Sequence, residues 1–264
     1  MNKEIKKITI LPGINKFGEK EKFEKIEIKK GEVVAIVGPT GAGKSQLLYD
    51  IEKLAQGDSK SKRIILVNDK RADKKIRFEP KRKLIASLAQ SMNFLTDISV
   101  KDFLSLHLKV RGKKIDSKLT KEVIEEANEI TGEPILPEMN LLNLSGGQSR
   151  ALMISDVANV SVSPIILIDE IENAGIDKEK AMQILVEEGK IVLIVTHDPV
   201  LAFNTDKRIV FKNGGIVKIL KTTLKEKGIG HYFNWVGNYS LEIREKIRNG
   251  EKVEKVNIFC EPVK

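Results

Sequence analysis

Apolar residues are grouped into short runs along most of the 264 positions of the chain. The runs EVVAIV (32–37), PIILID (164–169) and KIVLIV (190–195) are nearly continuous, as expected of strands buried on both faces of a parallel sheet. Between the last two lies KEKAMQILVEEG (178–189), whose apolar residues have helical spacing. Strand, helix and strand in this order form the repeating unit of a parallel sheet, so the pattern predicts an α/β fold.

Other segments predict smaller elements around this sheet. IKKITIL (5–11) and FEKIEIKK (23–30) read as strands that precede and follow a turn at Pro12 and Gly13. RIILVND (63–69) and KIRF (75–78) read as short strands of a second sheet. From 99 to 129 the spacing is helical, which predicts a helical insert at roughly 91–143. LEIREKIRNG (241–250) predicts one charged helix in the C-terminal tail. The apolar positions that define the insert are Val100, Phe103, Leu104, Leu108, Val123, Ile124, Ala127 and Ile130.

The segment GPTGAGKS, residues 38–45, follows the first apolar run directly. It matches G-x-x-x-x-G-K-[ST], the phosphate-binding P-loop, in which glycines let successive backbone N–H groups turn toward an anion. The helix predicted after it adds its N-terminus to the same place. We expect Lys44 to reach the β- and γ-phosphates of a nucleotide and Ser45 to hold Mg²⁺. The predicted nucleotide-binding residues are Gly38, Pro39, Thr40, Gly41, Ala42, Gly43, Lys44, Ser45 and Gln46.

The charged, aromatic and cysteine residues of the chain indicate which kinds of binding partner and which cellular compartment to expect. The net charge of +9 is concentrated in 60–83, with eleven Lys and Arg against three acids, and in 207–264, with thirteen against six. Such runs suit an anionic surface or a solvated face of a Lys/Glu-rich chain. Phe78 is the one aromatic in the first run, so no nucleic acid partner is expected. The single cysteine, Cys260, rules out an internal disulfide and favours a reducing cytoplasm.

A second anion device lies about a hundred residues after the P-loop. In LSGGQ (144–148), Ser145 is a good N-cap and two glycines free the backbone ahead of a helix. LSGGQ after a P-loop resembles the signature of ATP-binding cassette (ABC) ATPases, and further motifs follow in that family's order. These are a Q-loop at Gln90, a Walker B strand ending at Asp169 and Glu170, a D-loop ending at Asp177, and a switch histidine, His197. The resemblance covers about residues 4–220.

The resemblance implies a role for each of these residues. Asp169 would order Mg²⁺ together with Ser45 and Gln90, and Glu170 would activate the attacking water as general base. His197 would sense the γ-phosphate, so the catalytic set is Glu170, His197, Gln90 and Lys44. Phe17 is favoured by spacing over Phe23 to stack on the adenine. The signature residues Leu144, Ser145, Gly146, Gly147 and Gln148 would close over the ATP of a partner in a homodimer or beside a paired ABC subunit.

The implied fold is a P-loop core with a parallel sheet, a small antiparallel β-subdomain and an inserted helical subdomain. The nucleotide-binding domain is expected over 1–235, followed by a short extension, 236–264. The implied reaction is Mg²⁺-dependent hydrolysis of ATP by water attack on the γ-phosphate. Its cofactors are ATP and Mg²⁺, and its place is the cytoplasm, or the inner face of the membrane.

Two hypotheses remain for what hydrolysis drives. The first is a membrane transporter, with this chain as the energising subunit and the membrane permease as a separate chain. The second is a soluble ABC ATPase that remodels or loads a client protein, as in metallocofactor assembly. Family frequency favours the first. Three departures keep the second open: Ile171 after Glu170 where proline is usual, a longer link to Asp177, and Asp156 where an arginine is common.

Overall fold

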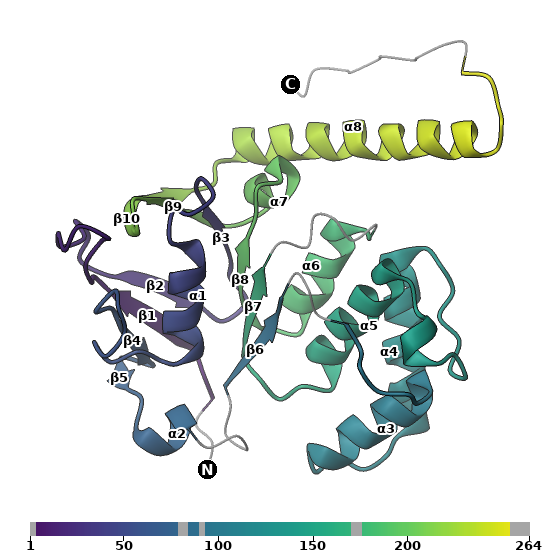
Figure 1. Ribbon diagram of the computed structural model, residues 1–264, viewed down its shortest axis with the longest axis horizontal. Coiled ribbons are helices and arrows are strands. Elements are labelled where there is room, and N and C mark those ends of the chain that lie inside the picture. Colours follow the sequence, from purple (N-terminus) through teal and green to yellow (C-terminus); the bar gives the residue numbers. More distant parts are fainter. Residues whose placement is uncertain (1–3, 79–83, 90–92, 170–175, 254–264) are drawn as a thin grey trace.

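The computed structural model describes residues 4–78, 84–89, 93–169 and 176–253. A six-stranded sheet runs through the centre in the order β10-β9-β3-β8-β7-β6 (Figure 1). Its strands are parallel except that β10 pairs antiparallel with β9. The strand bounds are β3 Val33–Val37, β6 Ile85–Leu88, β7 Ile165–Asp169, β8 Ile191–Val195, β9 Lys207–Lys212 and β10 Gly215–Lys221.

A second, four-stranded sheet is antiparallel and has the order β2-β1-β4-β5. Its strands are β1 Lys7–Leu11, β2 Ile26–Lys29, β4 Ile64–Val67 and β5 Lys70–Arg71. Helix α1 (Lys44–Glu52) lies between the two sheets in Figure 1. The predicted combination of a parallel core with a small antiparallel sheet is confirmed.

Two apolar cores lie on opposite faces of the central sheet, because successive side chains of a strand point to opposite sides. Val34 and Ile36 of β3 pack with Leu47 of α1 and with the antiparallel sheet. Val33 and Ala35, which alternate with them along β3, join the core on the other face, which includes the helical insert. Both faces of β3 are therefore covered, as its continuous apolar run predicted.

Helices form in the region where the sequence predicted a helical insert. That region contains α3 (Val100–Val110), α4 (Ser117–Thr131) and a 3₁₀ turn (Leu141–Asn143), and α5 (Gly146–Asn159) follows it. Seven of the eight residues that showed helical spacing are buried; Phe103 packs against the same core and is partly buried. Helix α6 (Lys178–Glu187) links β7 to β8, and α7 (Pro199–Phe203) follows β8.

One predicted strand is wrong. KIRF belongs to a short helix, α2 (Lys74–Phe78), and the strand that pairs with β4 is β5. The Asp73 carboxylate accepts a hydrogen bond from the N–H of Ile76 at 2.8 Å, which is the arrangement of a helix N-cap. This local cap stabilises the helical form of the segment. No residue of α2 is buried, so no packing against a sheet favours the extended form.

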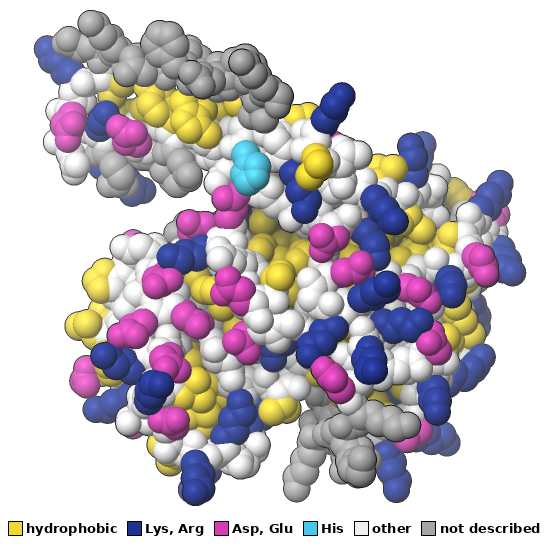
Figure 2. Space-filling view, turned by 180° about the vertical axis from the view of Figure 1, so that it is seen from behind, with side chains coloured by type: hydrophobic (Ala, Val, Ile, Leu, Met, Phe, Trp, Pro, Cys, Tyr) yellow, Lys and Arg dark blue, Asp and Glu magenta, His cyan; other side chains and the backbone are white. Residues whose placement is uncertain are grey.

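The C-terminal helix is longer than predicted. Helix α8 (Leu224–Arg248) has 25 residues, and it continues without interruption through residues 235 and 236, where the sequence suggested a division. In Figure 1 it lies across the end of the molecule that carries α7 and extends past the body. Within the described ranges, no helix is both long enough and apolar enough to cross a membrane. Figure 2 shows basic and acidic side chains interspersed over the body rather than gathered into one patch.

Candidate nucleotide-binding site

The P-loop needs glycine at two close approaches. Gly38 has a φ of 151°, and a Cβ there would lie 2.5 Å from the carbonyl oxygen of Phe211. Gly43 has a φ of 100°, and its Cβ would lie 2.9 Å from Cα of Gly214. Contacts this short exclude any side chain, and a positive φ strains other residues. The end of β9 and the β9–β10 turn therefore pack directly against the P-loop. The sequence motif alone does not show this contact.

Helix α1 begins at the P-loop with Gly43 as its N-cap, and no side chain caps it. Ser45, at its second position, is exposed, as are Pro39, Thr40 and Gly41 of the loop. The first N–H groups of an α-helix have no partner within the helix. They and the helix dipole can therefore act on an anion at this end. The side chain of Gln46, in contrast, donates to Asp50 one turn further along α1, at 2.9 Å.

Lys44 and His197 meet at this loop, although 153 residues separate them. Lys44 is 7% exposed, and its Nζ lies 2.7 Å from the carbonyl oxygen of Gly38, 3.2 Å from that of Pro39 and 3.1 Å from Nε2 of His197. An ammonium group can only donate, so Lys44 is the donor and Nε2 of His197 the acceptor in this contact. The structure thus brings together two residues that the sequence assigned to the γ-phosphate.

Asp169 reaches the same edge of the sheet. Its register partner in β8 is Val195, whose partner in β3 is Ile36. Neighbouring strands are about 4.8 Å apart, so the Asp169 backbone lies roughly 10 Å across the sheet from the strand that leads into the P-loop. His197 follows β8 between them. The carboxyl ends of β3, β8 and β7 therefore present the lysine, the histidine and the carboxylate side by side.

The LSGGQ segment forms the N-terminus of α5. Ser145 caps this helix, and a capping box joins it to Gln148: the hydroxyl accepts from the Gln148 N–H at 3.2 Å, and the Gln148 amide oxygen accepts from the Ser145 N–H at 2.9 Å. Gln148 is buried and also donates to the carbonyl of Pro134. Ser145 and Gly146 are exposed, whereas Leu144 and Gly147 are half-buried. Gln148 thus shapes the turn, and Ser145 and Gly146 form its open surface.

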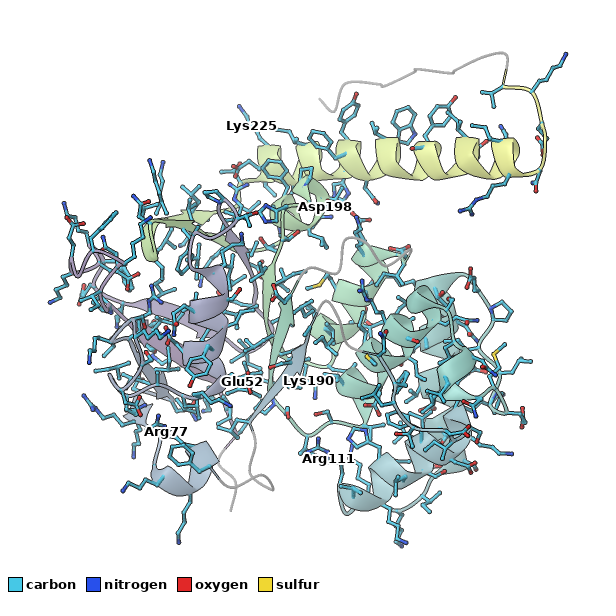
Figure 3. All side chains as sticks on the ribbon, in the orientation of Figure 1. Glu52, Arg77, Arg111, Lys190, Asp198 and Lys225 are labelled. Atoms are coloured by element: carbon cyan, nitrogen blue, oxygen red, sulfur yellow. The ribbon has the colours of Figure 1, made fainter. Side chains whose placement is uncertain are left out.

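Asp177 is the N-cap of α6 and accepts from the N–H of Lys180 at 3.0 Å. Its own N–H donates to the carbonyl of Ile130 at the end of α4, at 2.7 Å. Lys178, next to Asp177, pairs with Asp198, next to His197 and marked in Figure 3. Asp177 is therefore hydrogen-bonded to the helical insert, and its neighbour Lys178 is paired with the segment that carries His197.

Phe17 is 65% exposed, with the ammonium of Lys16 5.0 Å from its ring centre. Its loop reaches the P-loop indirectly. The N–H of Lys16 donates to the carbonyl of Asn213, and the N–H of Gly214 donates to that of Ala42. Phe23 packs against the core instead. Of the two rings, that of Phe17 is the exposed one. Gln90 and Glu170 lie outside the described residues, as does Ile171.

The sequence analysis missed a buried charge cluster behind the P-loop helix. Arg63 is fully buried and donates to Glu21 at 2.7 Å and to Asp50 of α1 at 3.0 Å. Glu21 also accepts from the N–H groups of Gly13 and Ile216. The cluster joins α1, the antiparallel sheet and the β9–β10 turn. No spacing pattern in the sequence indicates it, because its members come from four separate segments.

Comparisons with known proteins identify the family. A family model described as ABC transporter matches residues 24–173, more than half of the chain. An uncharacterized ABC transporter ATP-binding protein of Methanocaldococcus jannaschii is 54% identical over 255 residues, which cover 97% of each chain. The chain belongs to the ABC transporter family. The cassette also resembles the macrolide export ATP-binding/permease protein MacB of Campylobacter jejuni, with 31% identity over 217 residues, 76% of this chain and 31% of MacB.

Solved cassettes have the same fold. A dimeric cassette in a post-hydrolysis state bound to ADP and Pi aligns with a TM-score of 0.61 and 26% identity, over 82% of this chain and 99% of that one. CbiO1 of Clostridium perfringens, part of an ABC transporter complex, aligns with a TM-score of 0.61 and 25% identity, over 88% of this chain and 100% of that one. The predicted fold, family and ATPase activity are confirmed. The transporter hypothesis is the one supported, and the soluble client hypothesis is not favoured.

Proposed function

We propose that this ABC ATPase works as a two-fold dimer with Mg²⁺ and drives a membrane permease that is a separate chain. The observation that carries the proposal is the meeting of Lys44 and His197 at the P-loop, beside the N-terminus of α1. A cation, a hydrogen-bonding ring and unpaired helix N–H groups converge there. Such a site binds the phosphates of ATP and neutralises charge on the γ-phosphoryl group as it is transferred.

The residues present fit a magnesium ion. Mg²⁺ prefers oxygen ligands and is commonly held by one or two protein groups plus phosphate oxygens and water. The exposed hydroxyl of Ser45 and the half-buried carboxylate of Asp169 supply two oxygen ligands at the carboxyl edge of the sheet. Gln90 is proposed as a third. When bound, the ion supplies charge neutralisation between the β- and γ-phosphates.

Glu170 is proposed as the general base, one residue beyond β7. Its neighbour Asp169 is at the end of β7, in register with β8 and β3, and we propose that Glu170, the next residue in the sequence, reaches the γ-phosphate. From there it can orient the attacking water and take its proton. Positioning and charge neutralisation supply the rest of the rate enhancement.

We propose a dimer because each chain has two separate phosphate-binding motifs. Each chain has one P-loop and one LSGGQ turn, and the exposed Ser145 and Gly146 are free to meet a nucleotide held by another chain. A two-fold dimer then has two equivalent composite sites. A solved cassette of this fold is dimeric with ADP and Pi bound. We propose the same arrangement here, with a second copy or a paired ABC subunit as the partner.

The proposed permease contact is the segment from Gln90 to Asp97. In its described part, Leu95 is 92% exposed, whereas Phe94 packs edge-on against Phe103 of α3 with ring centres 5.0 Å apart. Asp97 accepts from Asn140, just before the turn that leads to LSGGQ, at 2.5 Å. A partner that binds this segment can therefore displace the LSGGQ turn through the hydrogen bond between Asn140 and Asp97. This contact would place the cassette at the cytoplasmic face of the membrane.

Replacing Glu170 by Gln tests the chemistry. The variant should bind Mg·ATP with an unchanged Kd but release phosphate about 10²–10⁴-fold more slowly, the usual contribution of a general base. Glu172→Gln, two residues further along, is the matched control and should keep wild-type turnover. Steady-state phosphate release and equilibrium ATP binding measure the two effects. Near-normal turnover in Glu170→Gln would refute the assignment of the base.

A further inference from the structure

Helix α8 is amphipathic in an unusual sense, because the side that contacts the body is polar. Glu226 pairs with Arg208 of β9, and Asn234 donates to Glu179 of α6 at 2.7 Å. Gly230, between them, is buried against α7: a Cβ there would lie 2.9 Å from Oδ1 of Asn204. The body-facing positions are thus 226, 230 and 234, one helical turn apart.

Apolar residues run along a different side of α8. With Ser240 counted among them, their spacing is four, three, four, three and four residues. At 3.6 residues per turn they lie about 100° around the helix from the body-facing side. Ile229 is 45% exposed, Phe233 40%, Val236 39% and Ile247 62%, while Ile243 is half-buried. We call this set the α8 stripe: Ile229, Phe233, Val236, Ser240, Ile243 and Ile247.

Stacked rings widen the apolar surface beside the stripe. The ring of Trp235 is parallel to that of Tyr239 at 5.7 Å between centres, and it stacks on Tyr232 at 6.4 Å. Figure 3 shows the ring side chains of α8 on the side turned away from the body. Figure 2 shows hydrophobic side chains gathered on the projecting end of this helix. A surface of this kind on a helix marks an interaction site.

We propose that the α8 stripe pairs with the α8 stripe of a second copy of this chain. Alternating steps of four and three residues are the heptad spacing by which two helices pack side by side, so the stripe is complementary to itself. The charges of 224–253 favour this occupant over an anionic lipid surface, since six Lys and Arg are nearly balanced by four acids. Helices that bind such lipids have a strongly basic polar face.

The location of α8 is continuous with the proposed ATP dimer. Glu179 accepts from Asn234 of α8 and from Asn204 at the end of α7, and it lies two residues after Asp177 on α6. Helix α8 is thus fixed to the two helices that begin beside the D-loop and switch residues. A stripe contact beside the nucleotide sites holds two cassettes together when those sites open. It goes beyond the proposed function, because it requires no nucleotide.

The test is the mass of the chain in solution without nucleotide. Light scattering and sedimentation at micromolar concentrations should show a dimer for the wild type. Phe233→Glu combined with Val236→Glu should raise the dimer Kd at least 100-fold, because it buries like charges opposite one another. Both positions are exposed in the single chain, so folding is retained. The matched control is the exchange Glu242→Lys with Lys246→Glu, which keeps their ion pair, lies about 120° around α8 from the stripe and should remain dimeric.

Cross-linking locates the contact. In a Cys260→Ser background, Val236→Cys should form a cross-linked dimer without nucleotide, and Glu242→Cys should not. A monomeric wild type would overturn the proposal. If that monomer sediments with phosphatidylglycerol vesicles through the stripe, the occupant is a lipid surface. If a chain ending at residue 253 dimerises where the full chain does not, the last residues of the chain occupy the stripe. The variant with Phe233→Glu and Val236→Glu should still bind ATP. Retained ATP binding shows that its loss of dimerisation is not caused by failure of the nucleotide site.

Discussion

At the residue scale, the molecule depends on ionisable side chains that sit inside it with their partners. Arg63 is enclosed with Glu21 and Asp50, and each carboxylate has further donors. Asp156 is 4% exposed and pairs with His107 of α3 at 2.7 Å. Removing one partner from a buried pair leaves an uncompensated charge, which costs far more than losing an ion pair at the surface.

Replacing Arg63 by Met should therefore destabilise the cassette by about 3–5 kcal/mol, because two buried carboxylates lose their cation. Since Asp50 lies on α1, ATP binding should weaken in the same variant. The control is Arg77→Met. Arg77 pairs with Asp58, which is 51% exposed, and this change should cost about 1 kcal/mol or less. Urea unfolding measures both; equal losses would show that the cluster is not a critical support.

The sequence could identify site residues only where a motif fixes their spacing. Lys44, Ser145 and Asp177 were predicted in this way, and the structure places them at helix N-termini as expected. Asp156 illustrates the limit. It was noted as a departure from the family pattern, and His107 was left without a role, yet the two form a pair between α3 and α5. Pairing across 49 residues has no local signal, so only the fold reveals it.

At the scale of elements, the hydrophobic periodicity correctly predicted the strands and helices whose apolar residues are buried. The strands β3, β7 and β8 and the helices of the insert have apolar residues fixed by the core, and they lie where the pattern indicated. The elements that differ, α2 and α8, bury little. In α8 the residues before 241 include three glycines and a cluster of aromatics, which weaken a helical prediction. Its start depends instead on contacts with β9 and α7, which are distant in sequence.

The attachment of α8 should depend on pH through Glu226. The Arg208 hydrogen bond, followed by that from the Thr223 N–H, lowers the pKa of Glu226 below its ordinary value. A lowered folded-state pKa stabilises the fold above the unfolded pKa of about 4.3, and this contribution is lost as pH falls through the folded pKa. Glu226→Gln should thus be less stable than wild type at pH 7, and the difference should disappear as pH falls through the lowered pKa of Glu226.

Trp235, the one tryptophan of the chain, reports this directly from within α8. Urea unfolding followed by its fluorescence, at several pH values, gives the wild-type and Glu226→Gln free energies. Arg208→Met should show the same loss at pH 7. A difference between wild type and Glu226→Gln that stays constant with pH would contradict this account of the anchor.

At the scale of the whole molecule, the proposed function makes one cassette half of a catalytic unit. The P-loop and the signature turn belong to different subdomains. The hydrogen bond from Asp177 to Ile130 connects the core to the helical insert, and the one from Asn140 to Asp97 lies within the insert. In the proposed function, these links would transmit nucleotide binding to the surface proposed to meet a permease. We propose that each ATP is hydrolysed between the P-loop of one chain and the LSGGQ of another.

Mixing two inactive variants tests that claim most directly. Lys44→Ala disables the P-loop, and Ser145→Arg blocks the exposed signature turn, so each alone should be inactive. In a mixed dimer both defects fall in one composite site, and the other site combines an intact P-loop with an intact LSGGQ. With random pairing in a two-fold dimer, phosphate release should recover to about a quarter of the wild-type rate. If the mixture releases phosphate no faster than the sum of the separate variants, the two-chain site is contradicted.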